Sequence, residues 1–513
     1  NGEWEQGASA YEKRGTAVMV PEWDAEKCIQ CNQCAFVCSH ATIRPFCLTA
    51  DEAANAPEST KLADTKPKAS EYKFTMAVSP LDCMGCGECV TVCPTKAIEM
   101  KPQESQAAQQ AAFDYCVENI RKKDNIPGVV SDISVKGSQF NQPLLEFSGS
   151  CAGCAETSYA RLITQLFGEK MFISNATGCS SIWGGTASIS PYTTNKESGF
   201  GPAWINSLFE DNAEHGLGMQ IGYETVRANL ITKVEALKGK NADLDAVIDK
   251  YLETKNNTKA NDAPAKALIA ALEACGCDES KEILKDKQYL AKKSFWIFGG
   301  DGWAYDIGFG GLDHVLASGK DVNVMVFDTE VYSNTGGQAS KATNIGAVAQ
   351  FAASGKTTKK KSLAEIAMSY GYVYVAQVAM GANPAQTLKA IAEAEAYPGP
   401  SLVIGYAPCE MHSIKGGMTN CQAEMKKAVD CGYWNLFRFN PQLADEGKNP
   451  FILESKEPKT EDYRKFMMGE ARYSALTRSF PDRAEGLFER SEVESTKRYA
   501  HLKRLQDLYA PEA

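Results

Sequence analysis

The sequence predicts an α/β protein in which a small α+β domain precedes a doubly wound parallel sheet. Three observations predict this arrangement. A cysteine motif occurs twice within residues 20–100, a strand–glycine turn–helix–strand unit lies within residues 294–338, and residues 205–293 are rich in Ala, Lys, Glu and Leu at helical spacing. The unit at 294–338 favours parallel strands, and the helical stretch before it is expected to be an insertion in the sheet domain.

Length and composition are those of a soluble globular chain with more than one domain. The 513 residues exceed a typical domain, and 44% hydrophobic and 23% charged residues are ordinary proportions. The net charge of −10 disfavours nucleic acid as the main partner. No apolar run approaches about eighteen residues and no signal-peptide pattern opens the chain, so a cytoplasmic protein is predicted.

We place the first domain at residues 1–125 and the second at residues 126–513. The boundary is the pattern-breaking sequence Asn125-Ile-Pro-Gly. The second domain is expected to contain the helical insertion at about 205–293 and a wrapping tail at about 415–513. The chain opens with NGEWEQGASAYEKRG, which resembles the interior of a longer polypeptide; a fragment and a processed subunit both remain open.

The chain has 18 cysteines, too many for ordinary packing, and their tight CxxC spacing in a chain without an export signal points to metal rather than to disulfides. The repeated motif is C-x2-C-x2-C-x3-C, the run found in bacterial ferredoxins. In that run three cysteines hold one [4Fe–4S] cluster and the fourth crosses to the other cluster. One cluster is therefore expected at Cys28, Cys31, Cys34 and Cys93, and the other at Cys83, Cys86, Cys89 and Cys38.

Two zinc sites are the alternative for these cysteines, and the fourth cysteine after x3 in both copies disfavours it. The first copy departs from the run, because Ser39 rather than proline follows Cys38. The insertion from residue 39 to residue 82 is longer than in a minimal ferredoxin. It contains Cys47, which is expected to be a core or surface thiol.

The strand–turn–helix–strand unit predicts a site for a cation and a diphosphate. An apolar strand at Ser294–Phe298 stops at Gly299-Gly300-Asp301-Gly302, and a second apolar strand, Val322–Phe327, ends at Asp328-Thr329. Because parallel strands end at one edge of the sheet, Asp301 and Thr329 are expected to be neighbours. Oxygen donors suit magnesium, and the unpaired N–H groups of the following helix suit a diphosphate.

The spacing within this unit resembles the thiamine diphosphate motif, in which GDG is followed by about 27 residues and a polar turn. That motif usually ends in two asparagines, and here Thr329 stands where a ligating asparagine is expected. A plain structural turn is the alternative. A dinucleotide fingerprint is disfavoured, because Tyr305 occupies the position of its third glycine.

Further cysteines follow other predicted strands. We expect a strand at residues 143–149, before Cys151 and Cys154. A second strand is expected at Met171–Ser174, and Cys179 comes after the turn that follows it. The last strand is expected at Leu402–Tyr406, before Cys409. Four cysteines at the edge that carries Asp301 would hold a third [4Fe–4S] cluster beside the diphosphate site. A thioredoxin-type redox pair is the alternative for Cys151 and Cys154, disfavoured by Cys179 and Cys409.

The rest of the sequence predicts further helices and strands in the second domain. It predicts a helix that ends near Phe167, a capping box at Ser362-x-x-Glu365, a strand at Tyr372–Val378, a helix capped by Asn383-Pro384 and a charged helix from Glu485 to Tyr509. The basic run Lys359–Lys361 is expected to be a solvated loop, with the docking of an acidic ferredoxin as the alternative.

Five motifs carry a resemblance that covers essentially all 513 residues. They are CAGCAET, NATGCSSIWGG, GDGWAYDIGFGG, DTEVYSNTGGQ and YAPCEMHS. In their order and type they resemble the C-terminal half of the pyruvate:ferredoxin oxidoreductase family. The resemblance implies magnesium held by Asp301, Thr329 and the carbonyl of Val331. It implies thiamine diphosphate contacts from Glu156, Cys179, Gly300, Asp301, Gly302, Trp303, Thr329, Glu330, Val331, Tyr332, Ser333 and Asn334. It implies a cluster proximal to the thiamine at Cys151, Cys154, Cys179 and Cys409.

The resemblance also implies a function. It implies oxidative decarboxylation of pyruvate to acetyl-CoA and CO2, with electrons leaving singly through three [4Fe–4S] clusters to ferredoxin or flavodoxin. The activating glutamate, the substrate-binding arginine and most of the coenzyme A site are expected in an N-terminal half absent from this sequence, and the full-length chain is expected to form a homodimer. A sister oxidoreductase for 2-oxoglutarate, oxaloacetate or an aryl pyruvate, and a non-catalytic polyferredoxin, remain the alternatives.

Overall fold

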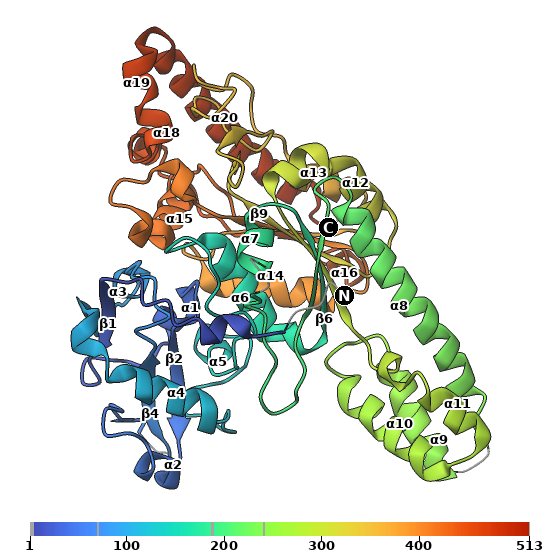
Figure 1. Ribbon diagram of the computed structural model, residues 1–513. Helices are drawn as coiled ribbons and strands as arrows, with labels where there is room; N and C mark the ends of the chain where they lie inside the picture. The colour runs from blue at the N-terminus through green and yellow to red at the C-terminus, as the bar shows by residue number, and fades with distance from the viewer. Residues whose placement is uncertain (1–4, 69–70, 186–188, 240–241, 512–513) are drawn as a thin grey trace.

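The computed structural model describes residues 5–68, 71–185, 189–239 and 242–511. The opening segment that resembles the interior of a longer polypeptide begins with four residues outside these ranges. Figure 1 shows an N-terminal lobe, a central sheet domain and a group of helices that projects away from the sheet. No helix in the described ranges has the length and apolar character that a membrane crossing requires.

The N-terminal lobe contains two small antiparallel sheets. One pairs β1 with β5, and the other has the order β2-β4-β3. The strands are β1 Met19–Trp23, β2 Ile43–Leu48, β3 Ala63–Asp64, β4 Lys73–Val78 and β5 Ile98–Pro102; the helices are α1 Gln33–Val37, α2 Ala50–Ala54, α3 Glu88–Thr91 and α4 Gln109–Asn119. Helices α1 and α3 each begin inside one copy of the cysteine motif. The α+β prediction for this lobe is confirmed.

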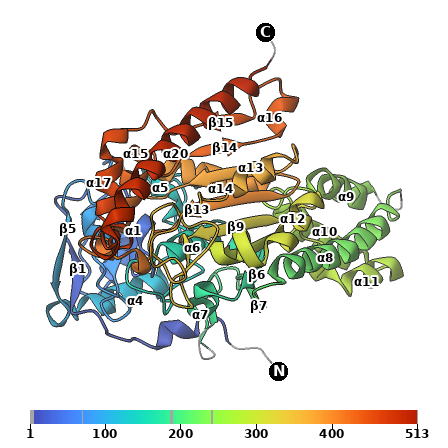
Figure 2. The same cartoon turned by 90° about the horizontal axis from the view of Figure 1, so that it is seen from above.

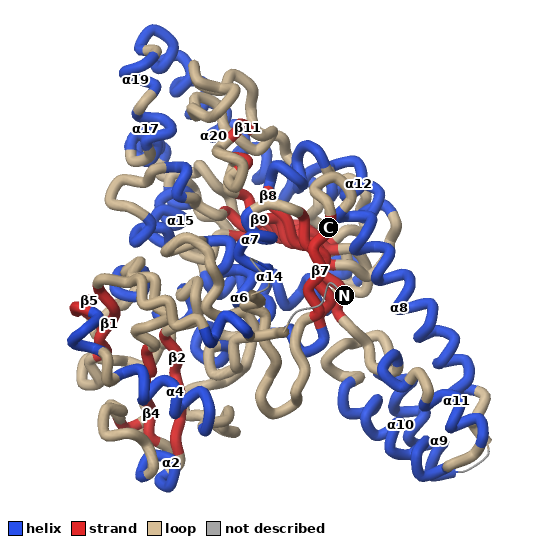
Figure 3. Tube along the Cα trace, viewed as in Figure 1, coloured by secondary structure: helices blue, strands red, loops and turns tan. Residues whose placement is uncertain are grey.

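The central domain is built on a mostly parallel eight-stranded sheet with the order β15-β14-β12-β13-β9-β8-β6-β7 (Figure 3). Its strands are β6 Met171–Ala176, β7 Ala203–Ser207, β8 Ser294–Gly300, β9 Asn323–Asp328, β12 Tyr374–Val378, β13 Ser401–Tyr406, β14 Phe437–Phe439 and β15 Phe451–Leu453. All six residues of β9 are buried, as continuous apolar runs in parallel sheets usually are. The predicted α/β fold is confirmed.

The strand predicted at residues 143–149 does not form. Only an isolated antiparallel bridge joins Leu145 to Tyr192. Pro143 has no N–H to donate to a ladder, and Phe147 has a left-handed φ of 54°, which takes the backbone out of the extended conformation. Cys151 therefore follows a loop rather than a strand of the sheet.

The helical stretch starts later than predicted. Residues 203–207 form the edge strand β7, which pairs in parallel with β6, and the first helix, α8, begins at Asn212. The projecting helices are α8 Asn212–Glu235, α9 Ala242–Thr254, α10 Asp262–Cys275 and α11 Asp278–Leu284 (Figure 1). They pack around a core of their own that includes Leu230, Ile248 and Leu268.

Two predicted helix starts have different outcomes. Asn383 caps α14, Pro384–Ala396, by accepting from the backbone N–H of Gln386 at 3.0 Å, as predicted. The capping box at Ser362 is wrong: the side chain of Ser362 makes no capping hydrogen bond to α13, Leu363–Met368. Its expected partner Glu365 instead contacts His501, with 2.5 Å between Oε1 and Nε2.

The segment after β13 adds strands as well as helices. The strands β14 and β15 were not predicted, so Leu402–Tyr406 is not the last strand of the sheet. The helices include α15 Cys421–Asp430, α16 Gln442–Asp445, α17 Tyr463–Met468, α18 Ala471–Ser474, α19 Leu476–Ser479 and α20 Pro481–Leu508. Figure 2 shows the long helix α20 lying along β14 and β15, and the amide of Asn449 donates to the carbonyl of Gln506 at 2.7 Å. The predicted charged terminal helix is confirmed.

Candidate active site and cysteine sets

The ends of β8 and β9 bring Asp301 and Thr329 together. The two strands are adjacent and parallel, with Gly300 opposite Phe327, so the residues that follow them meet at one edge of the sheet. Thr329 donates to Asp301 Oδ1 from its hydroxyl at 2.9 Å and from its backbone N–H at 3.2 Å. The hydroxyl of Ser340 donates to the other carboxyl oxygen at 2.5 Å.

The oxygen atoms around Asp301 suit a hard cation. Thr329 Oγ1 lies 3.0 Å from the carbonyl oxygen of Val331 and 2.7 Å from the hydroxyl of Ser333. Burial and then the neighbouring carboxylate of Asp328 raise the pKa of Asp301 to about 8, so this position would be stabilised by a positive charge. Carboxylate, hydroxyl and carbonyl oxygens are magnesium ligands, and magnesium commonly completes its coordination with phosphate oxygens. The donor set present therefore fits the predicted ion.

The described residues hold no group of three or more His, Cys, Asp or Glu side chains placed to bind a single metal ion. The oxygen set at Asp301 contains one carboxylate, one hydroxyl and one carbonyl, and magnesium bound there would need further ligands, such as phosphate oxygens or water.

The turn after Asp301 is a π-helix rather than the regular helix predicted. Residues Gly302–Ile307 form this wide turn, with the N–H of Gly308 donating to the carbonyl of Trp303 at 2.8 Å, and the α-helix α12 begins only at Phe309. Such wide turns occur frequently at functional sites. A side chain at Gly302 would place its Cβ 2.6 Å from the ring of Tyr332, so glycine is needed there.

The predicted loop at residues 329–334 divides into two parts. Tyr332 and Ser333 are half-buried beside the oxygen set, while Asn334 is exposed. Glu330 has a left-handed φ of 60°, and its side chain is fully buried. Its carboxylate contacts Lys360, Arg472, Tyr433 and Asn344 rather than Asp301.

Lys360 is not part of a solvated loop, so the interpretation of Lys359–Lys361 is wrong for this residue. Its side chain is only 10% exposed, and Nζ lies 2.8 Å from Asp328 and 3.0 Å from Glu330. It also lies over the ring of Trp434 at 4.9 Å. Buried carboxylates must be paired with a cation, and Lys360 serves Asp328 and Glu330 from about thirty residues further along the chain. Lys359 is exposed, as predicted.

Glu156 lies at the start of α6, Ala155–Phe167, next to the CxxC pair. It is buried and accepts a hydrogen bond from the indole N–H of Trp183 at 3.0 Å. Burial raises the pKa of Glu156 to about 7. Trp183 belongs to α7, Cys179–Gly185, so this bond joins α6, which follows Cys154, to the helix that begins with Cys179.

The third set of cysteines comes together around Glu156. Burial raises the pKa of Cys179, and the neighbouring Glu156, Cys409, Cys154 and Cys151 raise it further, in that order. Burial likewise raises the pKa of Cys409 to about 11, with the hydroxyl of Ser333 near enough to oppose the shift. The imidazole Nε2 of His412 lies 2.7 Å from the carbonyl oxygen of Thr329. Cys409 and the oxygen set are thus neighbours.

The cysteines of the N-terminal lobe lie in two adjoining groups. Cys28, Cys31, Cys34 and Cys93 line one small pocket. Burial raises the pKa of Cys89, and Cys86, Cys38, Cys34 and Cys83 raise it further. Cys38 therefore lies with the second copy of the motif, and Cys34 marks where the two sets adjoin. Thiolates are the usual ligands of iron–sulfur clusters, so thiols grouped in this way suit a cluster rather than a single metal ion.

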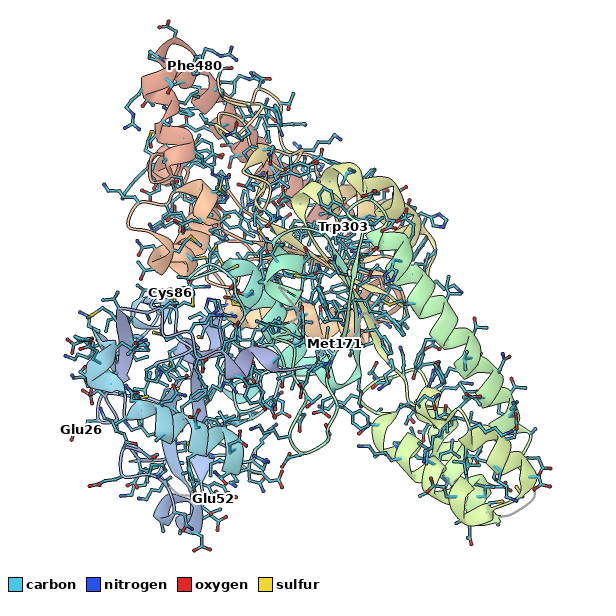
Figure 4. All side chains as sticks on the ribbon, viewed as in Figure 1. Glu26, Glu52, Cys86, Met171, Trp303 and Phe480 are labelled. Atoms are coloured by element: carbon cyan, nitrogen blue, oxygen red, sulfur yellow. The ribbon has the colours of Figure 1, made fainter. Side chains whose placement is uncertain are left out.

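Cys86, labelled in Figure 4, lies on the side of the N-terminal lobe that faces the α15 region of the central domain. Cys47 is a core thiol, 3% exposed. Cys275 and Cys277 have sulfur atoms 3.1 Å apart on the projecting helices.

Sequence reasoning missed Ser340, Lys360 and His412, which support Asp301, Asp328 and Thr329. No local pattern marks them, because each reaches its partner from a distant part of the chain. His412 lies three residues after Cys409, and this proximity was the one available signal.

Two family models match the chain. Residues 283–404 match the thiamine pyrophosphate enzyme C-terminal TPP binding domain, and residues 27–97 match a 4Fe-4S dicluster domain. The chain thus combines a thiamine diphosphate-binding domain with a domain for two iron–sulfur clusters, which is the composition of an iron–sulfur oxidoreductase.

Curated relatives match nearly the whole chain. Pyruvate:ferredoxin oxidoreductase from Moorella thermoacetica is 53% identical and pyruvate-flavodoxin oxidoreductase from Klebsiella pneumoniae is 52% identical, each over 98% of this chain and 43% of the relative. Over nearly its whole length the chain is similar to these pyruvate oxidoreductases. It spans less than half the length of these relatives. A solved 2-oxoglutarate:ferredoxin oxidoreductase from Magnetococcus marinus is 15% identical, with a TM-score of 0.32 over 57% of this chain and 69% of that one.

Proposed function

We propose that the protein to which this chain belongs converts pyruvate and coenzyme A to acetyl-CoA and CO2 and transfers the electrons, one at a time, to ferredoxin or flavodoxin. The observation that carries the proposal is the adjacency of the Asp301 oxygen set and the Cys151, Cys154, Cys179 and Cys409 set. Thr329, Ser333 and His412 connect the two sets. The names of the relatives supply the substrate and the acceptors.

Asp301, Thr329 and the carbonyl of Val331 would hold magnesium, and the turn Gly300–Trp303 would hold the diphosphate. Thiamine diphosphate, when bound, supplies a carbon nucleophile for the 2-oxo group and an acceptor for the electrons left when CO2 departs. The ring of Tyr332 lies close against Gly302 in this turn. Lys360 and Arg472 neutralise the buried carboxylates of Asp328 and Glu330, and this fixes the loop that carries Thr329.

The cysteine sets would form the electron path. Cys151, Cys154, Cys179 and Cys409 would hold the cluster next to the thiamine, and the two sets of the N-terminal lobe would hold the clusters that lead outward. Thiolates bind iron–sulfur clusters, and a chain of closely spaced clusters carries single electrons. Single-electron delivery suits ferredoxin and flavodoxin as acceptors.

The remaining parts of the reaction are assigned to residues outside this sequence. We propose that the N-terminal half of the same enzyme supplies the activating glutamate, the substrate-binding arginine and the coenzyme A domain. We further propose a homodimer of the full-length protein in the cytoplasm. This chain covers 43% of the length of each relative, and this supports the assignment of the other functions to a further part of the enzyme.

The test uses the full-length protein, reconstituted with iron, sulfide, thiamine diphosphate and magnesium. We expect CO2 release from pyruvate that requires both coenzyme A and oxidised ferredoxin or flavodoxin. Faster release from 2-oxoglutarate, oxaloacetate or an aryl pyruvate would identify a sister enzyme. If calorimetric titration shows no binding of thiamine diphosphate, the proposed activity is wrong and the non-catalytic polyferredoxin is favoured.

A further inference from the structure

The residues that follow Cys38 contact the loop that carries Cys151. Cys38 ends the first copy of the ferredoxin motif and lies with Cys83, Cys86 and Cys89. His40, two residues further on, is buried and only 2% exposed. Its imidazole lies against residues 148–151, which lead into the CxxC pair of the central domain.

His40 has three contacts with this loop. Its ring nitrogen Nε2 lies 3.2 Å from the carbonyl oxygen of Cys151, and Nδ1 lies 3.2 Å from the carbonyl oxygen of Ser148. The carbonyl oxygen of His40 accepts a hydrogen bond from the backbone N–H of Phe147 at 3.0 Å. Both ring contacts are to acceptors, so a protonated ring donates to both, and a neutral ring donates to one of them.

The opposite side of the same junction is closed by packing. Residues Met418–Asn420 lie between the two cysteine loops. A Cβ at Gly87, between Cys86 and Cys89, would lie 2.9 Å from the hydroxyl of Thr419. A Cβ at Gly153, between Cys151 and Cys154, would lie 3.0 Å from Cβ of Met418.

This packing leaves little freedom between the loops. The hydroxyl of Thr91 donates to the carbonyl of Thr419 at 3.1 Å, which fixes the inserted segment to α3. Both glycines have left-handed φ angles, 80° at Gly87 and 75° at Gly153, so other residues would strain these turns as well as clash. The second ferredoxin motif and the CxxC loop are therefore closely packed through Met418–Asn420, and His40 adds polar contacts to the CxxC loop.

We propose that His40 is the positioning residue that couples the Cys151–Cys154 loop to the Cys38 set for electron transfer. The inference rests on the proposed function and on the cluster assignments above. One connection between the two sets is Cys38–Ser39–His40, followed by a single contact to the carbonyl of Cys151. A second runs from the carbonyl of Val37, next to Cys38, through the hydroxyl of Ser158 to the carbonyl of Cys154. Covalent bonds and hydrogen bonds transmit electrons by tunnelling more effectively than gaps of the same length do.

In this step one electron leaves the reduced cluster at Cys151, Cys154, Cys179 and Cys409, which is oxidised. The same electron reduces the cluster at Cys38, Cys83, Cys86 and Cys89. No covalent bond forms or breaks, and no proton is required. The role of His40 is to keep the two loops in contact and to supply the connecting atoms.

The experiment compares His40→Leu and His40→Gln in the full-length reconstituted protein. Leucine removes both ring contacts, while the amide of glutamine can still donate to the carbonyl of Cys151. Samples are mixed with pyruvate and coenzyme A, frozen at successive times and examined by EPR spectroscopy. We expect His40→Leu to retain the iron content and reduction potentials of the parent, but to accumulate the reduced proximal cluster while reduction of the other clusters is delayed. His40→Gln is expected to restore much of the rate.

A second measurement does not depend on the reaction. Hydrogen exchange of the amides of residues 147–151 should be roughly fivefold faster in His40→Leu, because one net hydrogen bond that resists local opening is lost. Tyr251→Phe is the matched control. It removes another buried side-chain contact to a carbonyl, that of Leu290 at 2.8 Å, within the projecting helices.

The outcomes separate the two proposals. If pyruvate reduces no cluster in the parent protein, the proposed function fails. If the parent is reduced by pyruvate and His40→Leu, with intact clusters, transfers electrons between them at the parental rate, the role of His40 is wrong. An equal slowing in Tyr251→Phe would also overturn it, because the effect would then be one of general stability.

Discussion

Asp301 and Thr329 are 28 residues apart in the sequence and are joined by a hydrogen bond of 2.9 Å between the threonine hydroxyl and the aspartate carboxyl group. Each follows a strand of the same parallel pair, β8 and β9. The chain between the strands forms a π-helical turn and α12, and then returns along the sheet. This contact places an oxygen set suited to magnesium at the edge where the cysteines of the central domain gather.

Asp301→Asn is expected to abolish magnesium-dependent binding of thiamine diphosphate while leaving the iron content unchanged. The amide has nearly the shape of the carboxyl group but cannot supply the negative oxygen. The loss should exceed roughly a hundredfold in affinity, the upper range for residues that support metal ligands indirectly. Calorimetry with and without magnesium, together with iron analysis, measures both effects. A parallel loss of iron would show that the oxygen set and the cysteine sets are not separable.

Lys360→Met is expected to destabilise the protein by about 3–5 kcal/mol, because it leaves the buried carboxylates of Asp328 and Glu330 without their shared cation. Denaturant unfolding of the full-length protein followed by fluorescence gives the change. Lys359→Met is the matched control, since that lysine is exposed and its loss should change stability by no more than about 0.5 kcal/mol. Equal effects of the two variants would contradict the buried network.

Cys409→Ser is expected to remove one of the three clusters and lower the iron content by about a third, because a serine hydroxyl is a much weaker ligand than a thiolate. The EPR signals of the two clusters in the N-terminal lobe should persist. Cys421→Ser is the control: Cys421 is fully buried nearby, with its sulfur 3.9 Å from the carbonyl of Pro408, but lies outside the proposed ligand set. Unchanged iron in Cys409→Ser would rule out Cys409 as a ligand.

The pH dependence of the free energy of unfolding should show whether the pKa of Lys361 is lowered in the folded protein. Burial, followed by the nearby Lys341, lowers the pKa of Lys361 to about 8 from 10.5. Between these values the unfolded chain holds the proton and the folded chain releases it, so the contribution of Lys361 to stability rises with pH. Below about pH 8 the charged side chain destabilises the fold.

Lys361→Met removes this dependence, so the stability of the variant relative to the parent should fall as pH rises from about 8 to 10.5. Unfolding free energies of both proteins at several pH values give the difference, in which the titration of all other groups cancels. A difference that stays constant over this range would show that the pKa of Lys361 is not lowered.

The sequence correctly predicted the helices and strands whose own residues favour them. The apolar runs of β8 and β9, the Asn383 cap and the charged helix α20 each formed as predicted, because continuous burial, a side-chain cap and helical spacing act over a few residues. Cys38 lies near Cys89 of the second copy, and the ligands of each cluster stay a prediction. The two strands, the cap and the helix need only short-range chemistry to be specified.

Short and irregular segments were decided by their neighbours. β7 is half exposed and β14 and β15 have three residues each, so only pairing at the sheet edges makes them strands. Residues 143–149 are apolar enough for a strand, but Pro143 and the left-handed Phe147 leave a single bridge. The strand propensities of the residues could not show which of these segments form strands.

The sequence by itself determined the kinds of ligand that this protein offers and the order in which they occur: repeated thiolates, then oxygen donors after glycine turns. The tertiary structure alone decided how those groups are supported. Lys360 is buried because Asp328 and Glu330 need a cation, and His40 lies against Cys151 because two domains pack there. The physical reason is that ligand type is a property of single residues, whereas burial and charge pairing depend on residues far apart in the chain.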